Sequence, residues 1–572
     1  MSSKMFKRTA IAASLLAVTQ AHAALYRVYE PTINSSIISN GQYTEAMGVA
    51  IEPSSYPSNS LGCFAGSATC STDANLDQYK LAIQTLMYED DGARYREEVP
   101  FAMDNAFQYI QSNSDYVSYC TTELGYNSDY CQAWANIRYD KVWAPEQSGA
   151  AQSSPTDYIN AKVYVEGDST NYNDNGNTVV NSLQGTNPIG NKSDYTQGVT
   201  KRNVAFNGST SYSFSGLLSP TPDQSRAFYA DGTYVAGSTS YQSNNDNGTY
   251  SYSKATIWDG SDAVAIPYDG GSTLSDNKFG EGSIRSFYRD TTNNKIYAVG
   301  YNTYANQYMD ATIFTGSTDD ITTASWTSTP VQDAQVDAGG SFTYSNSVLT
   351  GVNQNLVAIG NAKRSGSKPY DGAAANRMFL VSNVSANSPT ASFFSGGIFF
   401  DGAGGRANAI NNFDEIVGEV DAENVSEIGG TPRRQRAFIY PYAGTNSNAA
   451  RRDIFDNKAW WLDDLTNGGT YSSANNAFRI IDATGINDQG IISATAIKCS
   501  ASGGYSSTND YATCNGSEST VAVKLIPIAG ATKADIDPRD KSYPKTERKG
   551  GSVGWLGLSV LALIGLQRRR RT

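Results

Sequence analysis

The sequence contains almost no histidine. Its 572 residues include one, His22, which lies in a leader that we expect to be removed. A chain without imidazole cannot perform Ser-His-Asp or Cys-His catalysis, and it lacks the usual ligand of zinc hydrolases and the histidine pH switch. These classes of function are therefore excluded for the mature protein.

Apolar runs long enough to span a membrane are also missing, since a span takes about 20 residues. A short run from Ala10 to Val18 follows three basic residues and precedes Ala21-His22-Ala23. A basic start, a short apolar run and a small-residue cleavage site are typical of a secretory signal peptide. We predict that residues 1–23 are a signal peptide, cut by signal peptidase after Ala23.

A second short apolar run, Val553 to Leu566, lies near the end of the chain. It follows Gly550-Gly551-Ser552 and precedes an arginine cluster. This arrangement closely resembles the Gly-Gly C-terminal sorting signal of Gram-negative surface proteins. The resemblance implies a rhomboid-type intramembrane protease that cuts near the glycines, and type II secretion of the product. Residues 550–572 would then be a sorting signal or transmembrane segment, and residues 529–549 a polar linker.

The alternative for this C-terminal segment is a permanent single-pass anchor. In either case the folded part, residues 24–528, is expected at the cell surface, at the outer membrane or outside the cell.

Basic residues are scarce in the rest of the chain. Seven of the 43 Lys and Arg lie in the two terminal segments, and none of the 55 Asp and Glu does, which leaves a net charge of −19. Such a balance argues against nucleic acid and anionic lipid as partners.

Cysteine is limited to six residues, and none forms a Cys-x-x-Cys pair. An even number in an exported chain indicates disulfides rather than a metal site. Six cysteines allow 15 connectivities, and the tight spacing favours three local bridges. The expected pairs are Cys63 with Cys70, Cys120 with Cys131, and Cys499 with Cys514.

The main positive feature is a repeat, clearest between Gly405 and Tyr442. There, the turn Asn411-Asn412-Phe413-Asp414 joins two short strands, and a polar loop leads to a third strand at 436–440. Copies of the second strand carry Gly237, Gly300, Gly360, Gly418 and Ser493, at spacings of 63, 60, 58 and 75 residues. A fixed period of this size indicates a repeat architecture.

A fourth strand fits between the copies, for example at Ala459-Trp460-Trp461-Leu462. Four short strands per unit favour an all-β fold, a β-propeller of six or seven blades, over a solenoid or sandwich.

The segments 436–440, Trp461-Leu462-Asp463-Asp464-Leu465 and Gly485 to Gly490 resemble the repeat named after its His-Ala-Phe triplet, although Arg436 stands where that repeat has His. As a whole the chain resembles domain-of-unknown-function family 3466, secreted bacterial proteins without assigned activity. The resemblance implies no catalytic residues.

Residues 72–140 differ from the repeat and predict a helical insertion near the first blade. Three stretches have helical spacing or a cap, and the Cys120–Cys131 bridge would pin the insertion. The residues are Leu76, Tyr79, Ile83, Leu86 and Met87; Met103, Phe107 and Ile110; and Cys131, Trp134 and Ile137 after a cap at Ser128.

No cofactor is expected. The loop Asn171 to Asn177 is rich in Asn and Asp, but Ser182 stands where an EF-hand has its glutamate. A weak Ca²⁺ site is possible there, and a plain loop is the favoured interpretation.

Loops between second and third strands should gather on one face of a propeller. They are rich in Tyr, Asn and Ser, residue types that suit binding surfaces. The candidate ligand-binding residues are Tyr241, Tyr250, Tyr304, Tyr308, Tyr505 and Tyr511.

These features predict an exported, non-enzymatic module that binds glycans or other surface polymers. One alternative is a carboxylate-based propeller glycosidase, which needs no histidine. Another is a structural protein of the surface layer.

Overall fold

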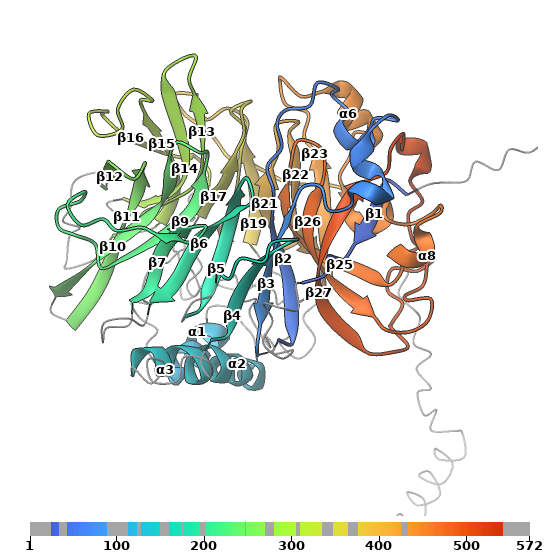
Figure 1. The fold of residues 1–572 in the computed structure, drawn as a ribbon, viewed down its shortest axis with the longest axis horizontal. Coiled ribbons are helices and arrows are strands. Elements are labelled where there is room, and N and C mark those ends of the chain that lie inside the picture. Colours follow the sequence, from blue (N-terminus) through green and yellow to red (C-terminus); the bar gives the residue numbers. More distant parts are fainter. Residues whose placement is uncertain are drawn as a thin grey trace, which may run out of the picture.

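The computed structural model describes residues 24–33, 43–88, 112–122, 127–148, 159–172, 176–194, 201–245, 248–268, 280–304, 309–334, 347–363, 376–424 and 433–541. It is a seven-bladed β-propeller (Figure 1). Each inner strand packs on the inner strand of the next blade, in the cyclic order β2, β5, β9, β13, β17, β21, β25 and back to β2. The predicted all-β propeller is therefore confirmed, with seven blades.

The strands are numbered along the chain, and their blades follow the same order. Blade 1 holds β2 (Glu45–Ile51), β3 (Leu81–Leu86) and β4 (Ala161–Val165), and blade 2 holds β5 (Thr178–Gln184), β6 (Asn187–Asp194), β7 (Lys201–Asn207) and β8 (Thr210–Ser211). Blade 3 holds β9 (Gln224–Ala230), β10 (Val235–Asn245), β11 (Gly248–Trp258) and β12 (Ala263–Ala265), and blade 4 holds β13 (Ser283–Asp290), β14 (Lys295–Thr303), β15 (Met309–Gly316) and β16 (Thr327–Pro330). Blade 5 holds β17 (Ser347–Val352), β18 (Ala358–Lys363), β19 (Asn376–Val381) and β20 (Ser392–Phe393), and blade 6 holds β21 (Gly405–Ile410), β22 (Glu415–Asp421), β23 (Gln435–Pro441) and β24 (Trp460–Trp461).

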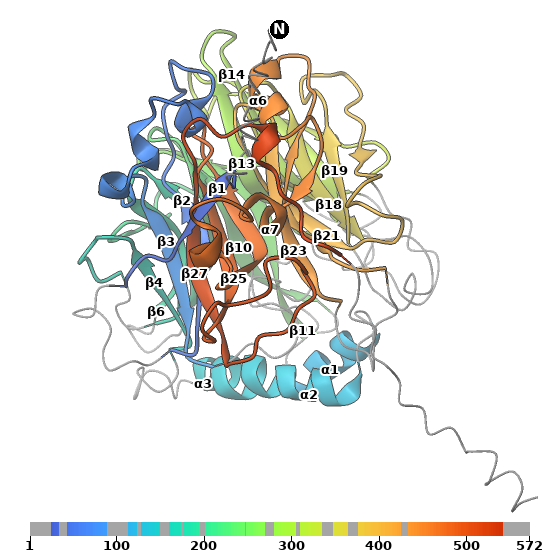
Figure 2. The ribbon, with the colours of Figure 1, turned by 90° about the vertical axis from the view of Figure 1, so that its right-hand side faces the viewer.

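Blade 7 closes the ring with strands from both ends of the chain. β25 (Phe478–Ile486), β26 (Ile492–Cys499) and β27 (Glu518–Pro527) come from the C-terminal part, and β1 (Tyr26–Tyr29) adds the outer strand. β1 pairs antiparallel with β27, from Tyr26 opposite Pro527 to Tyr29 opposite Lys524. Figure 2 shows β1 and β27 side by side on the face that it presents.

The repeated glycine of the second strand has a steric cause. A Cβ atom on Gly190, Gly237, Gly300 or Gly418 would lie 1.9 Å from a carbonyl oxygen of the neighbouring inner strand. At this level each inner strand also carries a bulge, because its register against the second strand shifts by one residue. The close approach at the bulge leaves no room for a side chain.

The bulged residues join neighbouring blades. The side chains of Asn181, Thr350, Asn408 and Thr484 donate hydrogen bonds to backbone carbonyls of the next blade, at 2.8, 2.7, 3.0 and 2.8 Å. The corresponding residues in blades 1, 3 and 4 are Val49, Phe228 and Arg285. Arg285 lies instead over the Phe228 ring, 3.8 Å from its centroid.

A helical insertion lies between β3 and β4. It comprises α1 (Asn113–Thr122), α2 (Ser128–Ala135), the π-helix η4 (Asn136–Trp143) and α3 (Ala144–Gln147). Cys120 and Cys131 form the expected disulfide between α1 and α2. The N-cap of α2 is Asn127, one residue before the expected Ser128, and its side chain accepts from Tyr130 N at 2.7 Å.

One part of the helical prediction is wrong. Residues 81–86 form β3, and all six are buried. Because both faces of β3 are buried, its apolar residues are not confined to alternate positions, and periodicity alone cannot tell such a strand from a helix. Met103, Phe107 and Ile110 lie outside the described residues.

The remaining regular elements are short. They are η1 (Gly62–Phe64), η2 (Thr69–Ser71), η3 (Asp73–Asn75), α6 (Ala449–Ile454), α7 (Leu462–Leu465), α8 (Ser472–Asn475) and η8 (Lys533–Asp535). The other two expected disulfides, Cys63–Cys70 and Cys499–Cys514, are also present. Residues 529–541, where the expected polar linker begins, contact the connection between β24 and β25 through Asn467 and Asp464.

Candidate functional site

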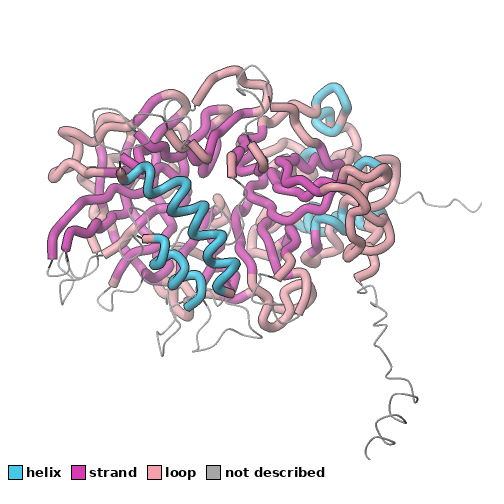
Figure 3. The backbone as a smooth tube through the Cα atoms, turned by 90° about the horizontal axis from the view of Figure 1, so that it is seen from below, coloured by secondary structure: helices cyan, strands magenta, loops and turns pink. Residues whose placement is uncertain are grey.

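The connections between second and third strands lie at one end of the ring, which we call the loop face. In blade 1 this connection contains the helical insertion, and Figure 3 shows the helices lying across this end. In blade 3 it is the β10–β11 hairpin, whose strands have 11 residues each. Val235 to Ser240 of β10 pair with β9, and the rest of the hairpin extends beyond that inner strand.

The structure buries three of the tyrosines expected to present a contact surface. Tyr241 is 5% exposed, and Tyr505 and Tyr511 are each 6% exposed. The Tyr505 hydroxyl donates to Glu518 Oε1 at 2.6 Å, and the Tyr511 hydroxyl donates to Ala422 O at 3.2 Å. The hydroxyl groups of Tyr505 and Tyr511 therefore already have partners inside the protein.

Of the other three tyrosines, only Tyr304 has a described side chain. It is partly buried, and its hydroxyl lies 3.0 Å from Thr312 Oγ1. Tyr308 and the side chain of Tyr250 lie outside the described part of the structure.

Beside Tyr241 lies Lys254, a residue that no sequence pattern identifies. The Tyr241 ring stacks on Tyr252, directly opposite in the hairpin, with centroids 5.2 Å apart and planes 20° apart. The ammonium of Lys254 lies 5.8 Å from the centroid of the Tyr241 ring. Thr239 and Thr256 lie buried on the same face of the hairpin, with hydroxyl oxygens 2.8 Å apart.

Lys254 is half-buried and, within the described residues, forms no ion pair and no hydrogen bond through its ammonium group. Burial lowers the pKa of this ammonium group. An uncompensated charge in such a place is costly, and perturbed lysines of this kind mark candidate functional sites. We call Lys254, Tyr241, Tyr252, Thr239 and Thr256 the lysine site.

Burial and, after it, the charge of Asp223 raise the pKa of Tyr241 and Tyr252, and the Asp223 carboxylate accepts from Gln242 N at 2.7 Å. A second carboxylate near β11 belongs to the other face of the strand. Ser253 is adjacent to Lys254, so its side chain points to the opposite side of the sheet. Its hydroxyl donates to buried Glu281, whose backbone N–H donates to Thr303 Oγ1 at 2.8 Å. Glu281 is therefore fixed between blades 3 and 4, away from the ammonium group of Lys254.

Comparison with known protein families identifies the chain. A family model described as "Protein of unknown function (DUF3466)" matches residues 240–570, which is more than half of the sequence. The protein belongs to the DUF3466 family. No curated protein matches it. The matched region begins in β10, so blades 1 and 2 and the helical insertion precede it.

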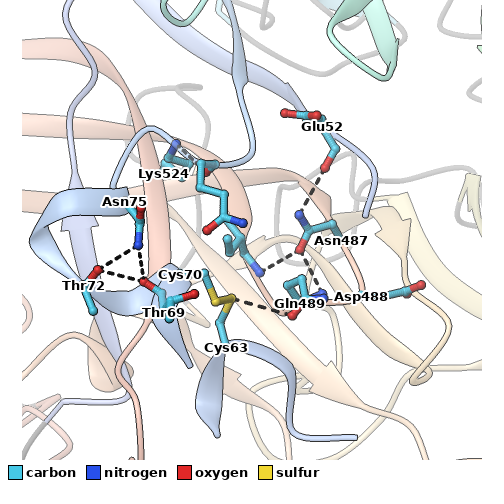
Figure 4. Close-up of a disulfide and its surroundings, with 12 residues drawn as sticks. Glu52, Cys63, Thr69, Cys70, Thr72, Asn75, Asn487, Asp488, Gln489 and Lys524 are labelled. Atoms are coloured by element: carbon cyan, nitrogen blue, oxygen red, sulfur yellow. Dashed lines mark hydrogen bonds between the residues drawn. A yellow bond between two sulfur atoms is a disulfide. The ribbon is translucent and has the colours of Figure 1, made fainter. Parts of the chain in front are cut away.

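The opposite end of this DUF3466 protein, the turn face, carries the turns between inner and second strands. Asn353, Asn411 and Asn487 occupy equivalent positions there, and the Oδ1 atom of each accepts two backbone N–H groups of its own turn. Their Nδ2 atoms donate to the backbone oxygens of Asn411, Asn487 and Glu52 in the next blade, at 2.9, 3.1 and 3.1 Å. Figure 4 shows the last of these bonds beside the Cys63–Cys70 disulfide. These turns thus connect successive blades.

The turn face also carries an aromatic residue that sequence reasoning missed. Tyr56 is 50% exposed and stacks on buried Phe413, with centroids 4.7 Å apart. Beneath Phe413 lies the fully buried guanidinium of Arg451, whose Nε atom is 2.7 Å from Glu415 Oε1. Tyr56 follows β2 in an irregular loop, where no periodic pattern identifies it.

Two further sequence hypotheses concern metal and membrane. Residues 173–175 of the Asn-rich loop lie outside the described part, and Tyr172 hydrogen-bonds Asp168 at 2.5 Å. The described ranges contain no group of three or more His, Cys, Asp or Glu side chains placed to hold a metal. They also contain no helix long and apolar enough to cross a membrane, and residues 550–572 lie outside them.

Proposed function

We propose that this protein is exported and that its loop face binds a glycan bearing a carboxylate or sulfate group. Lys254 carries the proposal, because it is a half-buried cation without an anionic partner among the described residues. A ligand carboxylate would supply the missing charge, and charge-assisted hydrogen bonds are the strong ones. Tyr252, which is partly exposed and stacks on Tyr241, supplies aromatic contact area beside it.

The net charge of −19 over residues 24–549 also limits the ligand. A densely charged polyanion would be repelled at many points along its length. A glycan with isolated acidic units would be repelled little, because physiological salt screens each acidic unit from protein charges more than about 8 Å away. We therefore favour a mostly neutral surface polysaccharide with occasional acidic residues.

Export is supported by the signal peptide pattern at residues 1–23 and by three disulfides, which are typical of oxidising compartments. The C-terminal Gly550-Gly551-Ser552 pattern supports processing by a rhomboid-type protease and type II secretion. Mass spectrometry of the secreted protein tests both ends. A mature chain beginning at Ala24 and ending near Gly550 is expected, whereas a retained N-terminus would contradict export through a signal peptide.

A glycan screen tests the binding proposal. Residues 24–549 would be presented with matched neutral and acidic oligosaccharides that differ only in a C6 carboxylate. Retention of the acidic member alone is expected, since only that member pairs with Lys254. Equal retention of both, or of neither across a broad set, would contradict it.

A further inference from the structure

A short C-terminal segment docks onto the propeller beyond its last strand. Residues 537–541, which we call the strap, follow β27 and η8. Asp540 N donates to Thr508 O at 2.8 Å, and Asp510 N donates to Asp540 O at 3.0 Å. This parallel bridge fastens the strap to the connection between β26 and β27.

The strap also contacts blade 6 and the segment before β25. Arg539 N donates to Asp464 Oδ1 of α7 at 3.1 Å, and Asn467 Nδ2 donates to Asp537 O at 2.9 Å. The Arg539 side chain is 3% exposed; it donates to Asn476 Oδ1 at 2.7 Å and also to Asp463 O. The strap therefore joins blade 6 to the closing blade.

The charges beneath the strap explain why it docks. Without it, two buried arginines face three buried carboxylates: Arg436, Arg479, Asp463, Asp464 and Asp510. The strap adds two cations to this group. Lys541 Nζ lies 2.8 Å from Asp464 Oδ2 and 3.9 Å from the centroid of the Trp461 ring.

Asp464 depends on the strap most directly. It is fully buried, and within the described chain its ion-pair partner is Lys541. A buried carboxylate without a partner is strongly unfavourable. If the strap undocked, the Asp464 carboxylate would therefore either stay buried without its ion-pair partner or become exposed to solvent.

We propose that residues 537–541 are a clasp that completes the propeller and fixes where the C-terminal extension leaves it. The clasp surface combines α7 of blade 6, Asn476 and residues 508–510, so it exists only after the closing blade has formed. Cleavage that removes the extension would leave the clasp in place. The segment is thus part of the folded domain rather than of the linker.

Limited trypsin digestion of the full chain tests this proposal, because trypsin cleaves after Arg539. We expect a resistant core that retains the strap. Asp464→Asn should raise the rate of cleavage after Arg539 at least tenfold, since it removes the charge that holds Lys541 and Arg539. The matched control is Asp453→Asn, which removes an exposed ion pair to Lys533 of the same C-terminal segment and should leave the rate unchanged.

A second variant keeps the test informative if Asp464→Asn does not fold. Lys541→Met removes the strap's own charge at a partly exposed position and should raise the same rate severalfold. The clasp would be refuted if trypsin cleaved the native chain after Arg539 as fast as it cleaved within the extension. It would also be refuted if the folded strap variants were cleaved no faster than Asp453→Asn.

Discussion

Lys524 Nζ of β27 lies 2.7 Å from Glu166 Oε2, at the end of β4, and both side chains are buried. The ammonium group also donates to the backbone oxygens of Gln78 and Tyr79, at 3.3 and 3.0 Å. This ion pair thus ties the closing blade to the outer part of blade 1, across the point where the ring closes.

The first prediction concerns this pair. Lys524→Met should lower the free energy of unfolding by about 3–5 kcal/mol, because it leaves Glu166 buried without its cation. Chemical denaturation measures the change. Lys498→Met is the matched control, since its ion pair with Glu30 is partly exposed to solvent and should contribute under about 1 kcal/mol. Equal losses in the two variants would contradict a special role for Lys524.

The repeated glycine gives a second prediction. Gly237→Ala places a Cβ atom 1.9 Å from Arg226 O, so the backbone of blade 3 must shift. We expect a loss of about 3 kcal/mol or more in unfolding free energy, as for severe overpacking. Gly66→Ala has no atom within 4 Å of its new Cβ and should be nearly neutral. If Gly237→Ala left the unfolding free energy unchanged, the repeated glycine would have another cause.

Alkaline pH gives a third prediction. Burial, with nearby acidic groups, raises the pKa of Tyr229 and Tyr511 from the ordinary tyrosine value of 10.0 to about 12. A pKa raised in the folded state gives stability that is complete below pH 10 and is lost as pH rises toward 12. The melting temperature should therefore fall by several degrees between pH 10 and pH 11.

Thermal melts followed by circular dichroism, with phenolate absorbance recorded in parallel, test this dependence. Tyr229→Phe should reduce the alkaline loss, while Tyr43→Phe, at an exposed position, should not. A melting temperature independent of pH up to 12 would disagree with the burial of these hydroxyls.

The repeat was readable from the sequence where its spacing was regular. Five copies of the second strand were identified, and they are β10, β14, β18, β22 and β26. Blade 2 also has the repeated glycine, Gly190, but only 47 residues before Gly237, outside the spacing of the other copies. Blade 1 was hidden because 74 residues separate Leu86 of β3 from Ala161 of β4.

The candidate site was less accessible to sequence reasoning. Loop composition marked the correct residue type at Tyr241, but its burial depends on the register that places Tyr252 directly opposite. No sequence pattern identifies Lys254. Its lack of an ion-pair partner among the described residues depends on where the fold places the surrounding carboxylates. The disulfides, in contrast, join cysteines close in sequence, where proximity alone favoured the correct pairing.

The most direct test of the lysine site is a binding titration of Lys254 variants with the acidic oligosaccharide from the glycan screen. Lys254→Gln should weaken binding about tenfold or more, the equivalent of one lost charge-assisted hydrogen bond, and Lys254→Arg should retain part of it. Lys295→Gln, an exposed lysine at the turn face, and Tyr56→Ala should leave the affinity unchanged. Unchanged affinity in Lys254→Gln, or a loss confined to Tyr56→Ala, would contradict a binding site on the loop face.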